Sequence, residues 1–472
     1  MVHRSKKDGR VAFYQMLREL AILGAEAPTT LRGVRTAGQR TPEELIDRYN
    51  LVNRPIRDLL VEYLRERQPT LDYTTLDDLS YYLGKRFWAD LEAHHPGIDS
   101  LRLTPEVAEE WKRRIRTRAK TTATPDGATT QVTVERINFR QCMTAVRVFY
   151  LDLAQWALEE PGRWGPWAAP CPVGNKDVNS RKAKRHLKAR MDARTRERLP
   201  VLPVLVRSVN DRRRASRALL ATAEATPPGQ TFTEAGTTLR RSVLNNCSPG
   251  TVWADDPATG KRRNLTREED HAFWVWAIVE VLRTTGIRIE ELLEISHHSL
   301  VQYRLPTTGE LVPLLQIVPS KTDAERLLVI SPDLAEVLST IICRVRDRAG
   351  AVPLVNAYDG HERLWLPPAP RLCQRRVGTE TRAIAASGTP RLPNQAKAET
   401  GLVNPLDGQP LHYTPHDFRR MFITDAILNG LPPHIAQIIA GHRDINTTLG
   451  YKAVYPEEAI QAHLAFLGRR RA

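Results

Sequence analysis

The stretch "TPHDFRRMFITDAILNG", residues 414–430, reads as one helix with polar groups gathered at its start. Thr414 is a suitable N-cap, and Pro415 is a suitable first residue because the N–H that proline lacks has no partner in the first turn. His416 and Arg419 then lie three residues apart and share one helix face. A histidine that caps the helix or lies at the edge of the core is the alternative, because an isolated His-x-x-Arg is weak evidence for a site.

Further along, "GHRDINTTLGY", residues 441–451, places a Gly-His pair before a lone tyrosine. Gly441 ends the preceding helical pattern, and a left-handed conformation there would turn the chain so that His442 points away from that helix. The residues that follow predict a short helix that carries Tyr451. Tyr451 could be a reactive side chain or a half-buried core aromatic. Tyr455 is a second candidate for a reactive role and ranks below Tyr451.

A third polar position precedes these helices, in "LRTTGIRIEELLEI", residues 282–295. A buried helix is expected to end at Gly286, and the next helix would then carry Arg288 in its first turn. There the guanidinium and the helix amides can face one anion together. An exposed ion pair between Arg288 and Glu291 is the alternative.

Between these stretches, "LLQIVPSKTDAERLLVIS", residues 314–331, alternates in a way that predicts a hairpin. Two apolar strands flank a polar turn, and that turn carries Lys321.

The composition points to a polyanion as the partner. Lys and Arg number 69 against 54 Asp and Glu, a net charge of +15, which favours nucleic acid. The most apolar stretch, residues 272–282, is far shorter than the roughly 20 residues that a bilayer needs, so no membrane partner is expected. The start of the chain lacks a secretory signal, and the five scattered cysteines form no C-x-x-C pair. Both features fit a reducing cytoplasm and argue against a zinc knuckle.

The chain divides into four predicted segments. Residues 1–70 have no assigned role. Residues 71–175 carry three amphipathic patterns that predict a small helical bundle. Residues 176–198 form a basic bridge, and residues 199–472 form a second domain that includes a loop-like stretch at about 225–265.

The basic bridge holds ten Lys or Arg against three acids. We expect it to contact DNA, and a solvated charge run is the alternative. The residues expected at the DNA are Lys176, Arg181, Lys182, Lys184, Arg185, Lys188 and Arg190.

In chain order the second domain offers an arginine, a hairpin lysine, His-x-x-Arg, Gly-His and a tyrosine. This series resembles the tyrosine recombinases, also called phage integrases, over roughly residues 200–455. The preceding bundle is similar in placement to the family's SAM-like core-binding domain. The resemblance implies a mainly α fold with a small β-sheet or hairpin, in which a helical core-binding domain and an α+β catalytic domain form a clamp around duplex DNA.

The resemblance also implies that Tyr451 is the nucleophile of a site-specific DNA recombinase. A free tyrosine is only about 0.1% ionised at pH 7, so it needs a nearby base or a positive field. His416 would assist its proton transfer. Arg420 stands where many members have histidine, which is tolerable if its side chain points off the catalytic face.

The other family positions would act on the DNA phosphate. Arg288 and Arg419 would bind the non-bridging oxygens, because each guanidinium can hold two of them. Lys321 would protonate the leaving 5′ oxygen as a general acid. His442 would donate a hydrogen bond to the phosphate, and Glu291 would orient these groups.

The sequence shows neither a carboxylate cluster for Mg²⁺ nor a G-x-x-x-x-G-K-[ST] motif. We therefore expect cleavage without metal, ATP or any other cofactor. The expected partners are double-stranded recombination sites, further copies of the chain in a tetramer, and accessory recombination proteins. The resemblance suggests that a tail helix, residues 456–472, packs on a neighbouring protomer; docking on its own core is the alternative.

Two other functions stay open. A type IB topoisomerase uses a similar constellation but relaxes DNA without pairing two sites. A non-catalytic DNA-binding protein could use the same scaffold. The leading interpretation is an integrase or transposase of a mobile element, acting in the cytoplasm at the nucleoid.

Overall fold

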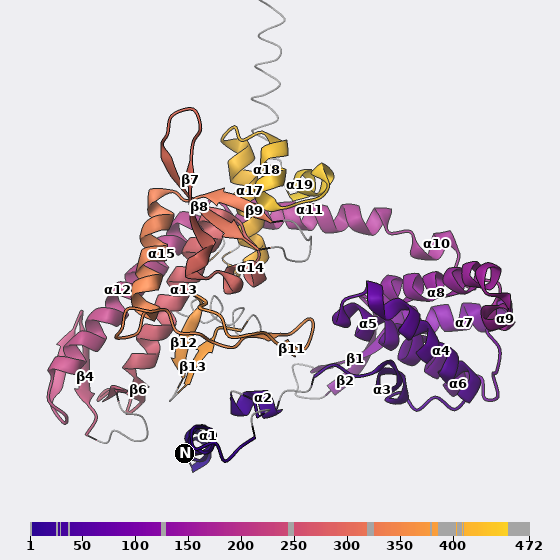
Figure 1. Ribbon diagram of the computed structural model, residues 1–472, viewed down its shortest axis with the longest axis horizontal. Coiled ribbons are helices and arrows are strands. Elements are labelled where there is room, and N and C mark those ends of the chain that lie inside the picture. The colour runs from indigo at the N-terminus through magenta and orange to yellow at the C-terminus, as the bar shows by residue number, and fades with distance from the viewer. Residues whose placement is uncertain are drawn as a thin grey trace, which may run out of the picture. The chain divides into compact units, whose positions relative to one another are not determined.

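The computed structural model forms two compact units (Figure 1). Unit 1 comprises Met1–Arg35, His186–Ala357 and Trp365–Ala472, and unit 2 comprises Thr36–Arg185 and Tyr358–Leu364. The fold is mainly α-helical with several small sheets, as predicted. The structure describes residues 2–24, 27–28, 30–35, 38–123, 129–243, 250–318, 325–377, 380–385, 403, 408 and 410–451.

Unit 2 is a helical bundle that begins before residue 71, where the sequence placed its start. Leu45 and Tyr63, from the segment without an assigned role, lie in the same core as Phe149. In that core the Phe87 ring meets Trp111 edge-on at a centroid distance of 5.1 Å. The elements are α3 (Pro42–Asp47), α4 (Arg54–Arg67), α5 (Tyr73–Ser80), the π-helical η2 (Tyr81–Trp88), α6 (Ala89–His94), α7 (Pro105–Arg116), β1 (Thr117–Ala123), β2 (Thr129–Glu135), α8 (Phe139–Glu159), α9 (Pro161–Trp164) and α10 (Asn175–Val178), with short 3-10 turns η1 (Gln68–Thr70) and η3 (Gly165–Trp167).

A short segment from the second half of the chain completes unit 2. It runs from β10 (Tyr358–Asp359) into β11 (Leu364–Trp365). The Glu362 carboxylate accepts a hydrogen bond from the Tyr73 backbone at 3.3 Å, and Arg363 pairs with Asp77 at 2.9 Å. The segment therefore packs against the start of α5.

Unit 1 holds the residues that carry the predicted chemistry. Helix α11 (Arg181–Arg198) starts in unit 2 and continues here, so much of the predicted bridge is helical. The remaining elements are α1 (Val2–Glu19), α2 (Leu31–Arg35), α12 (Leu202–Ala225), β3 (Thr231–Glu234), β4 (Thr237–Arg241), β5 (Trp253–Asp255), β6 (Arg262–Asn264), α13 (Leu265–Thr285), α14 (Ile289–Glu294), η4 (His297–Ser299), β7 (Leu300–Arg304), β8 (Leu311–Ile317), β9 (Arg326–Val329), α15 (Pro332–Val345), β12 (Gln374–Val377), β13 (Glu380–Ala383), α17 (Pro415–Leu428), α18 (Pro433–Ala440) and α19 (Ile445–Tyr451).

Helix α13 is the centre of unit 1. Its residues from Ala272 to Leu282 are all buried, which fits a helix that is apolar on every side. The helix ends at Gly286, whose φ of +62° is left-handed. A Cβ atom at this glycine would lie 2.3 Å from Cδ1 of Phe422 on α17. Only glycine therefore allows α17 to pack this closely on the end of α13.

Two antiparallel sheets flank this core. The stretch expected to be loop-like at about 225–265 instead contains a four-stranded sheet in the order β3-β4-β5-β6, so that prediction was wrong. The predicted hairpin is present as β8 and β9 of a three-stranded sheet, in which Ile317 pairs with Arg326. Lys321 falls between these strands in the sequence, outside the described residues.

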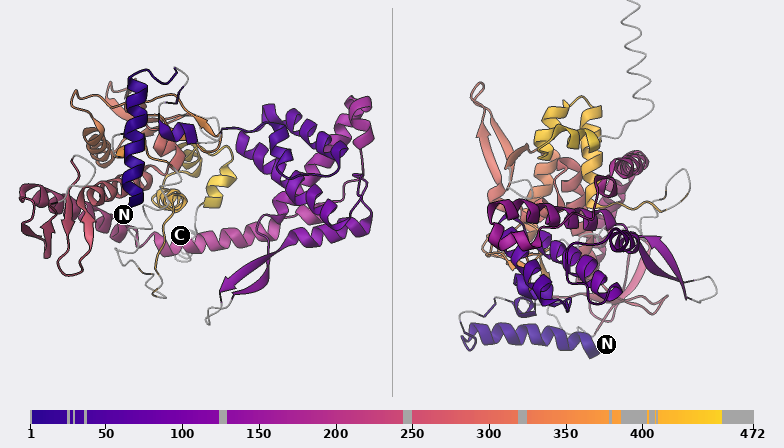
Figure 2. Two further views of the ribbon diagram at one scale, coloured as in Figure 1. Left: turned by 90° about the horizontal axis from the view of Figure 1, so that it is seen from below. Right: turned by 90° about the vertical axis from the view of Figure 1, so that its right-hand side faces the viewer.

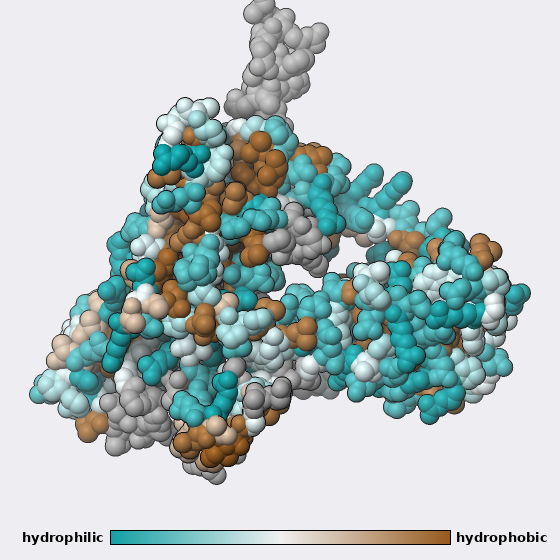
Figure 3. Space-filling view, in the orientation of Figure 1, coloured by the Kyte–Doolittle hydropathy of each residue, from teal (hydrophilic) through white to brown (hydrophobic). Residues whose placement is uncertain are grey.

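Helix α1 presents apolar side chains to solvent. Phe13, Met16 and Leu20 are exposed, and Figure 3 shows hydrophobic side chains gathered over this helix. Among the described helices, including α1, none has the length and apolar character that crossing a bilayer requires.

Candidate active site

Five of the six predicted catalytic positions lie in unit 1 within the described residues. Arg288 is the N-cap of α14, and His416 and Arg419 lie in the first turns of α17. His442 follows the left-handed Gly441 that ends α18, and Tyr451 is the last residue of α19. Because the sequence supplies the caps and the terminating glycines, these positions follow from local rules. The sixth, Lys321, falls outside the described residues, as do Tyr455 and the predicted tail helix.

Tyr451 is held beside a histidine. Its phenol oxygen lies 2.8 Å from Nε2 of His416, and the two ring centroids are 5.2 Å apart. Burial, with help from the charges of Arg419 and Arg420, lowers the pKa of His416. A neutral imidazole can accept the phenol proton through Nε2, so this pair has the geometry of a nucleophile and its base.

Arg419 is one of the most buried residues of the chain, with 1% of its surface exposed. One of its Nη atoms donates to the carbonyl of Gly286 at 2.9 Å, and the other donates to the carbonyl of Ala440. These two bonds join the ends of α13 and α18 to α17. Burial and the charge of Arg288 lower the pKa of Arg419 to about 10, so the guanidinium stays charged at neutral pH.

His442 is a partner of Arg419. Its Nε2 lies 2.8 Å from an Nη atom of Arg419, and its Nδ1 lies 2.9 Å from the hydroxyl of Thr448. Burial, followed by the charges of Arg419 and Arg288, lowers the pKa of His442 to about 3. A neutral ring that accepts from Arg419 must carry its proton on Nδ1. The predicted donation from His442 to a phosphate stays a prediction.

Glu291 joins two arginines. Its carboxylate accepts from the Arg288 backbone at 2.7 Å, from the Arg288 guanidinium at 2.8 Å and from Arg326 at 2.5 Å. Burial alone would raise its pKa, but the hydrogen bonds from Arg326 and Arg288 outweigh burial and lower the pKa to about 2. The pair of Arg288 and Glu291 therefore exists, but its carboxylate is buried, unlike the exposed pair that was the alternative.

Arg326 is a site residue that the sequence analysis missed. It is 6% exposed, and its Nε and one Nη have no hydrogen-bond partner among the described residues. A Cβ atom at Gly441 would lie 2.8 Å from that Nη, so the arginine packs against the turn before His442. The available signal was alternation along β9, which places Arg326 on the same inward face as Leu328.

The Arg420 side chain reaches helix α11 and also lies near the Tyr451 ring. It pairs with Asp192 at 2.8 Å and reaches the carbonyl of Gly450 at 3.4 Å. Its guanidinium lies 5.2 Å from the centre of the Tyr451 ring. This residue thus ties the helix that carries the tyrosine to the predicted bridge.

The predicted bridge itself has two kinds of residue. Towards its end, Arg194 binds both carboxylate oxygens of Asp417 at 2.7 and 2.6 Å, which docks α11 on α17. The seven residues expected at DNA are all exposed, although Lys188 also pairs with Asp192 at 2.8 Å. Those seven are Lys176, Arg181, Lys182, Lys184, Arg185, Lys188 and Arg190.

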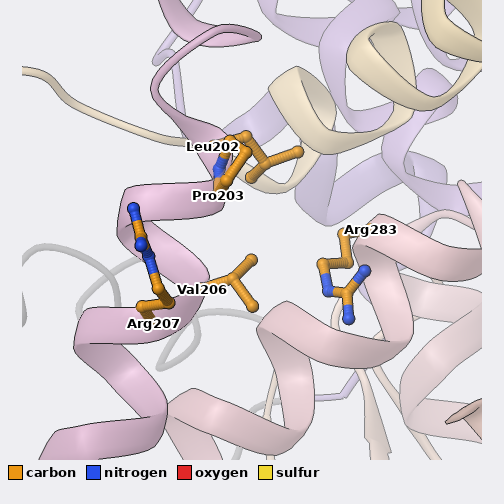
Figure 4. A pocket seen from close by; sticks show the side chains of 5 residues that line it. All are labelled: Leu202, Pro203, Val206, Arg207 and Arg283. Atoms are coloured by element: carbon orange, nitrogen blue, oxygen red, sulfur yellow. The ribbon is translucent and has the colours of Figure 1, made fainter.

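A separate pocket of about 540 Å³ lies between α12 and α13 (Figure 4). Leu202, Pro203, Val206, Arg207 and Arg283 line it, and none of the predicted site residues takes part. Among the described residues, no cluster of three or more His, Cys, Asp or Glu forms that could hold a metal ion.

Comparison with known proteins gives one family match. Residues 263–458 match the model of the phage integrase family. No curated protein matches the chain significantly.

Several solved structures are similar at low sequence identity. The Tn1549 transposon integrase in complex with circular intermediate DNA shares 15% identity over 91% of this chain and 100% of that chain, with a TM-score of 0.42. XerA recombinase shares 14% identity over 90% of this chain and 98% of its own, with a TM-score of 0.29. XerH site-specific recombinase bound to its difH substrate shares 13% identity over 41% of this chain and 46% of its own, with a TM-score of 0.27. The chain therefore spans about half the length of XerH. Likeness at this level carries no argument about function.

Proposed function

Residues 263–458 of this chain belong to the phage integrase family, and we propose that the protein is a site-specific DNA recombinase. It cleaves and rejoins duplex DNA through a 3′-phosphotyrosyl intermediate. The observation that carries this proposal is the 2.8 Å contact between the Tyr451 oxygen and Nε2 of His416, beside the buried Arg419. A phenol needs such a base and such a positive field before it can attack a phosphodiester.

The reaction is a displacement at phosphorus. As the Tyr451 oxygen attacks, its proton passes to the neutral His416, and the bond from phosphorus to the 5′ oxygen breaks. Lys321 gives its proton to that leaving oxygen. The guanidinium groups of Arg288 and Arg419 hold the non-bridging oxygens, where negative charge grows in the transition state.

Two further residues support these groups. Glu291 orients Arg288. His442 donates a hydrogen bond to the phosphate during the reaction, which requires its Nε2 to leave Arg419 and to carry the ring proton. Rejoining runs the same steps backwards with a 5′ hydroxyl from another strand. Because the phosphotyrosine bond stores the energy of the broken linkage, the cycle uses no ATP. The charged side chains neutralise the phosphate charge, which a metal ion does in other enzymes.

Assembly and context complete the proposal. Four copies pair two recombination sites, with accessory proteins assisting, and the exposed basic residues of α10 and α11 hold the DNA backbone. Both units contact the duplex, and residues 456–472, which lie outside the described residues, link neighbouring protomers. The proposed role is the movement of a mobile element, carried out at the nucleoid in the cytoplasm.

Trapping of the intermediate tests the proposal. The substrate is a duplex that carries a candidate recombination site and a nick beside the cleavage position. After attack, the short strand that ends in the 5′ hydroxyl diffuses away, so rejoining cannot occur. The wild-type protein should then accumulate a detergent-stable adduct with DNA, and Tyr451→Phe should form none. An adduct formed by the Phe variant would identify a different nucleophile.

The same preparation separates the two alternatives. Rapid relaxation of a supercoiled plasmid without a recombination site would favour a topoisomerase. Tight DNA binding by wild-type protein without any adduct would favour a non-catalytic binding protein.

A further inference from the structure

Unit 2 carries a β-ribbon that the bundle does not need for its core. Strands β1 and β2 pair antiparallel along their whole length, from Thr117 with Glu135 to Ala123 with Thr129. The ribbon projects from the helices of its unit (Figure 2). Residues 117–122 of β1 are all exposed, and in β2 only Val134 is partly buried. A two-stranded ribbon with both faces in water is marginally stable by itself, so a partner is expected to cover it.

The side chains of the ribbon suit nucleic acid better than protein. Successive residues of a strand point to opposite faces, and the pairing places Arg118 opposite Val134 and Lys120 opposite Val132. The other face pairs Thr121 with Gln131. The described ribbon thus combines two cations with hydroxyl and amide groups, which donate to and accept from base edges and phosphates.

Further positive charge lies at the base of the ribbon. Arg136 donates through Nε to the carbonyl of Ile115 at 2.9 Å and through an Nη to the carbonyl of Thr117 at 2.9 Å, so it holds the start of β1. Burial lowers the pKa of Arg136, and so do the nearby charges of Arg86 and Arg118. The Nε of Arg86 has no hydrogen-bond partner among the described residues.

An anion bound beside Arg136 would offset the charges of Arg86 and Arg118 that disfavour its charged form. The repeating anion of the proposed substrate is the DNA phosphate, which arginine binds through two N–H groups at once. A major groove about 12 Å wide accepts a two-stranded β-ribbon.

We propose that the β1–β2 ribbon enters the major groove of duplex DNA, while Arg118 and Lys120 of the ribbon and Arg86 and Arg136 at its base hold the adjoining phosphates. The inference rests on the proposed function only in taking DNA as the partner. It adds a reading element within unit 2, separate from the basic helix α11.

Photo-crosslinking from the ribbon tests where it lies. A photoreactive amino acid replaces Gln131 in the full-length chain, and a control places it at Leu158, which is 78% exposed at the end of α8. Irradiation with duplex DNA should crosslink position 131, but not position 158, to DNA. Bulky glucosyl groups in the major groove should abolish that crosslink, and a minor-groove ligand should leave it. Crosslinks to a second copy of the chain, or none, would overturn the inference.

Salt dependence tests the phosphate contacts. Each neutralised phosphate adds about 0.9 to the slope of log affinity against log salt, so Arg118→Gln with Lys120→Gln should reduce the slope by about 2. The control pair, Arg346→Gln with Arg348→Gln, removes the same charge from exposed residues of unit 1. A reduction no larger than the control's would count against the proposal.

Adduct formation by Tyr451 keeps the two hypotheses apart. A wild-type protein that forms the adduct but shows no ribbon crosslink would contradict this inference and leave the proposed function intact. A protein that crosslinks through the ribbon but forms no adduct would contradict the proposed function and leave this inference intact.

Discussion

The phenol oxygen of Tyr451 lies 2.8 Å from Nε2 of His416, and burial lowers the pKa of that histidine below its usual 6.5. The imidazole therefore stays neutral across the physiological range and loses its capacity to accept a proton only at acid pH.

We expect the rate of adduct formation to be constant above pH 6.5 and to fall as the pH drops through the lowered pKa of His416. His416→Gln removes the base, so the rate should fall about 100-fold or more, within the usual range for a general base, and the acid limb should disappear. Single-turnover measurements from pH 5 to 8 check both effects. An unchanged acid limb in the Gln variant would assign that limb to another group.

Arg326 is expected to act through Glu291 and Arg288. Its 2.5 Å contact with the Glu291 carboxylate fixes the group that holds Arg288, and a small misplacement of a reacting group can cost on the order of 100-fold in rate. Arg326→Met should therefore slow cleavage by about that factor, and Arg326→Lys should recover part of it.

A sulfur leaving group separates this role from proton donation. A substrate with sulfur at the 5′ bridging position needs no general acid, because a thiolate leaves unprotonated. It should rescue Lys321→Ala but not Arg326→Met. Rescue of both variants would mean that Arg326 acts by positioning the hairpin lysine instead.

The sequence could predict the parts of the site that local rules determine. The helix cap at Thr414, the three-residue spacing of His416 and Arg419, and the glycine before His442 each place one side chain without reference to the rest of the fold. Arg326 was missed because its role comes from Glu291, 35 residues away in the chain. Only tertiary structure brings these two together.

The four-stranded sheet was missed for a related reason. Strands β5 and β6 have three residues each, which is too short for alternation to be recognised. Their pairing partners fix them, as in the register of Trp253 with Asn264. The segment therefore looks like a loop when its residues are considered one after another.

Gly286→Ala should destabilise unit 1 well beyond the cost of its backbone conformation. The left-handed φ of +62° costs an alanine roughly 1 kcal/mol, and the new Cβ would also lie 2.3 Å from Phe422. Gly350→Ala is a matched control, since its φ is +80° and no atom lies within 4 Å of the added Cβ. Thermal unfolding should show a larger fall in Tm for Gly286→Ala. Equal falls would mean that the Phe422 ring moves aside freely.

Acid should destabilise the fold partly through His442. Its folded pKa of about 3 lies below the usual 6.5 of a histidine, so its contribution is complete above pH 6.5 and is lost as the pH falls towards 3. The contribution of Glu291, whose pKa is lowered from 4.5 to about 2, is complete above pH 4.5 and is lost only below that pH, so it does not change between pH 6.5 and 4.5. Between pH 6.5 and 4.5, His442→Gln should therefore lose roughly 2 kcal/mol less free energy of unfolding than the wild type. Urea unfolding at both pH values checks this, and parallel losses would contradict it.

Arg420 should matter for cleavage but not for DNA affinity. It is buried, pairs with Asp192 and lies 5.2 Å from the Tyr451 ring centre. Its charge lies where it can stabilise the negative charge that develops around the attacking phenol in the transition state, and its contact with the Gly450 carbonyl holds the end of α19. Arg420→Met should slow adduct formation by about 10-fold or more, since one lost charge-assisted contact is worth roughly 1.5–3 kcal/mol. Arg420→Lys, which keeps the charge, should lose less. A filter-binding measurement should give the same affinity for all three proteins, because the side chain does not reach the surface. If Arg420→Met cleaves at the wild-type rate, the tie between α11 and the tyrosine helix serves stability alone.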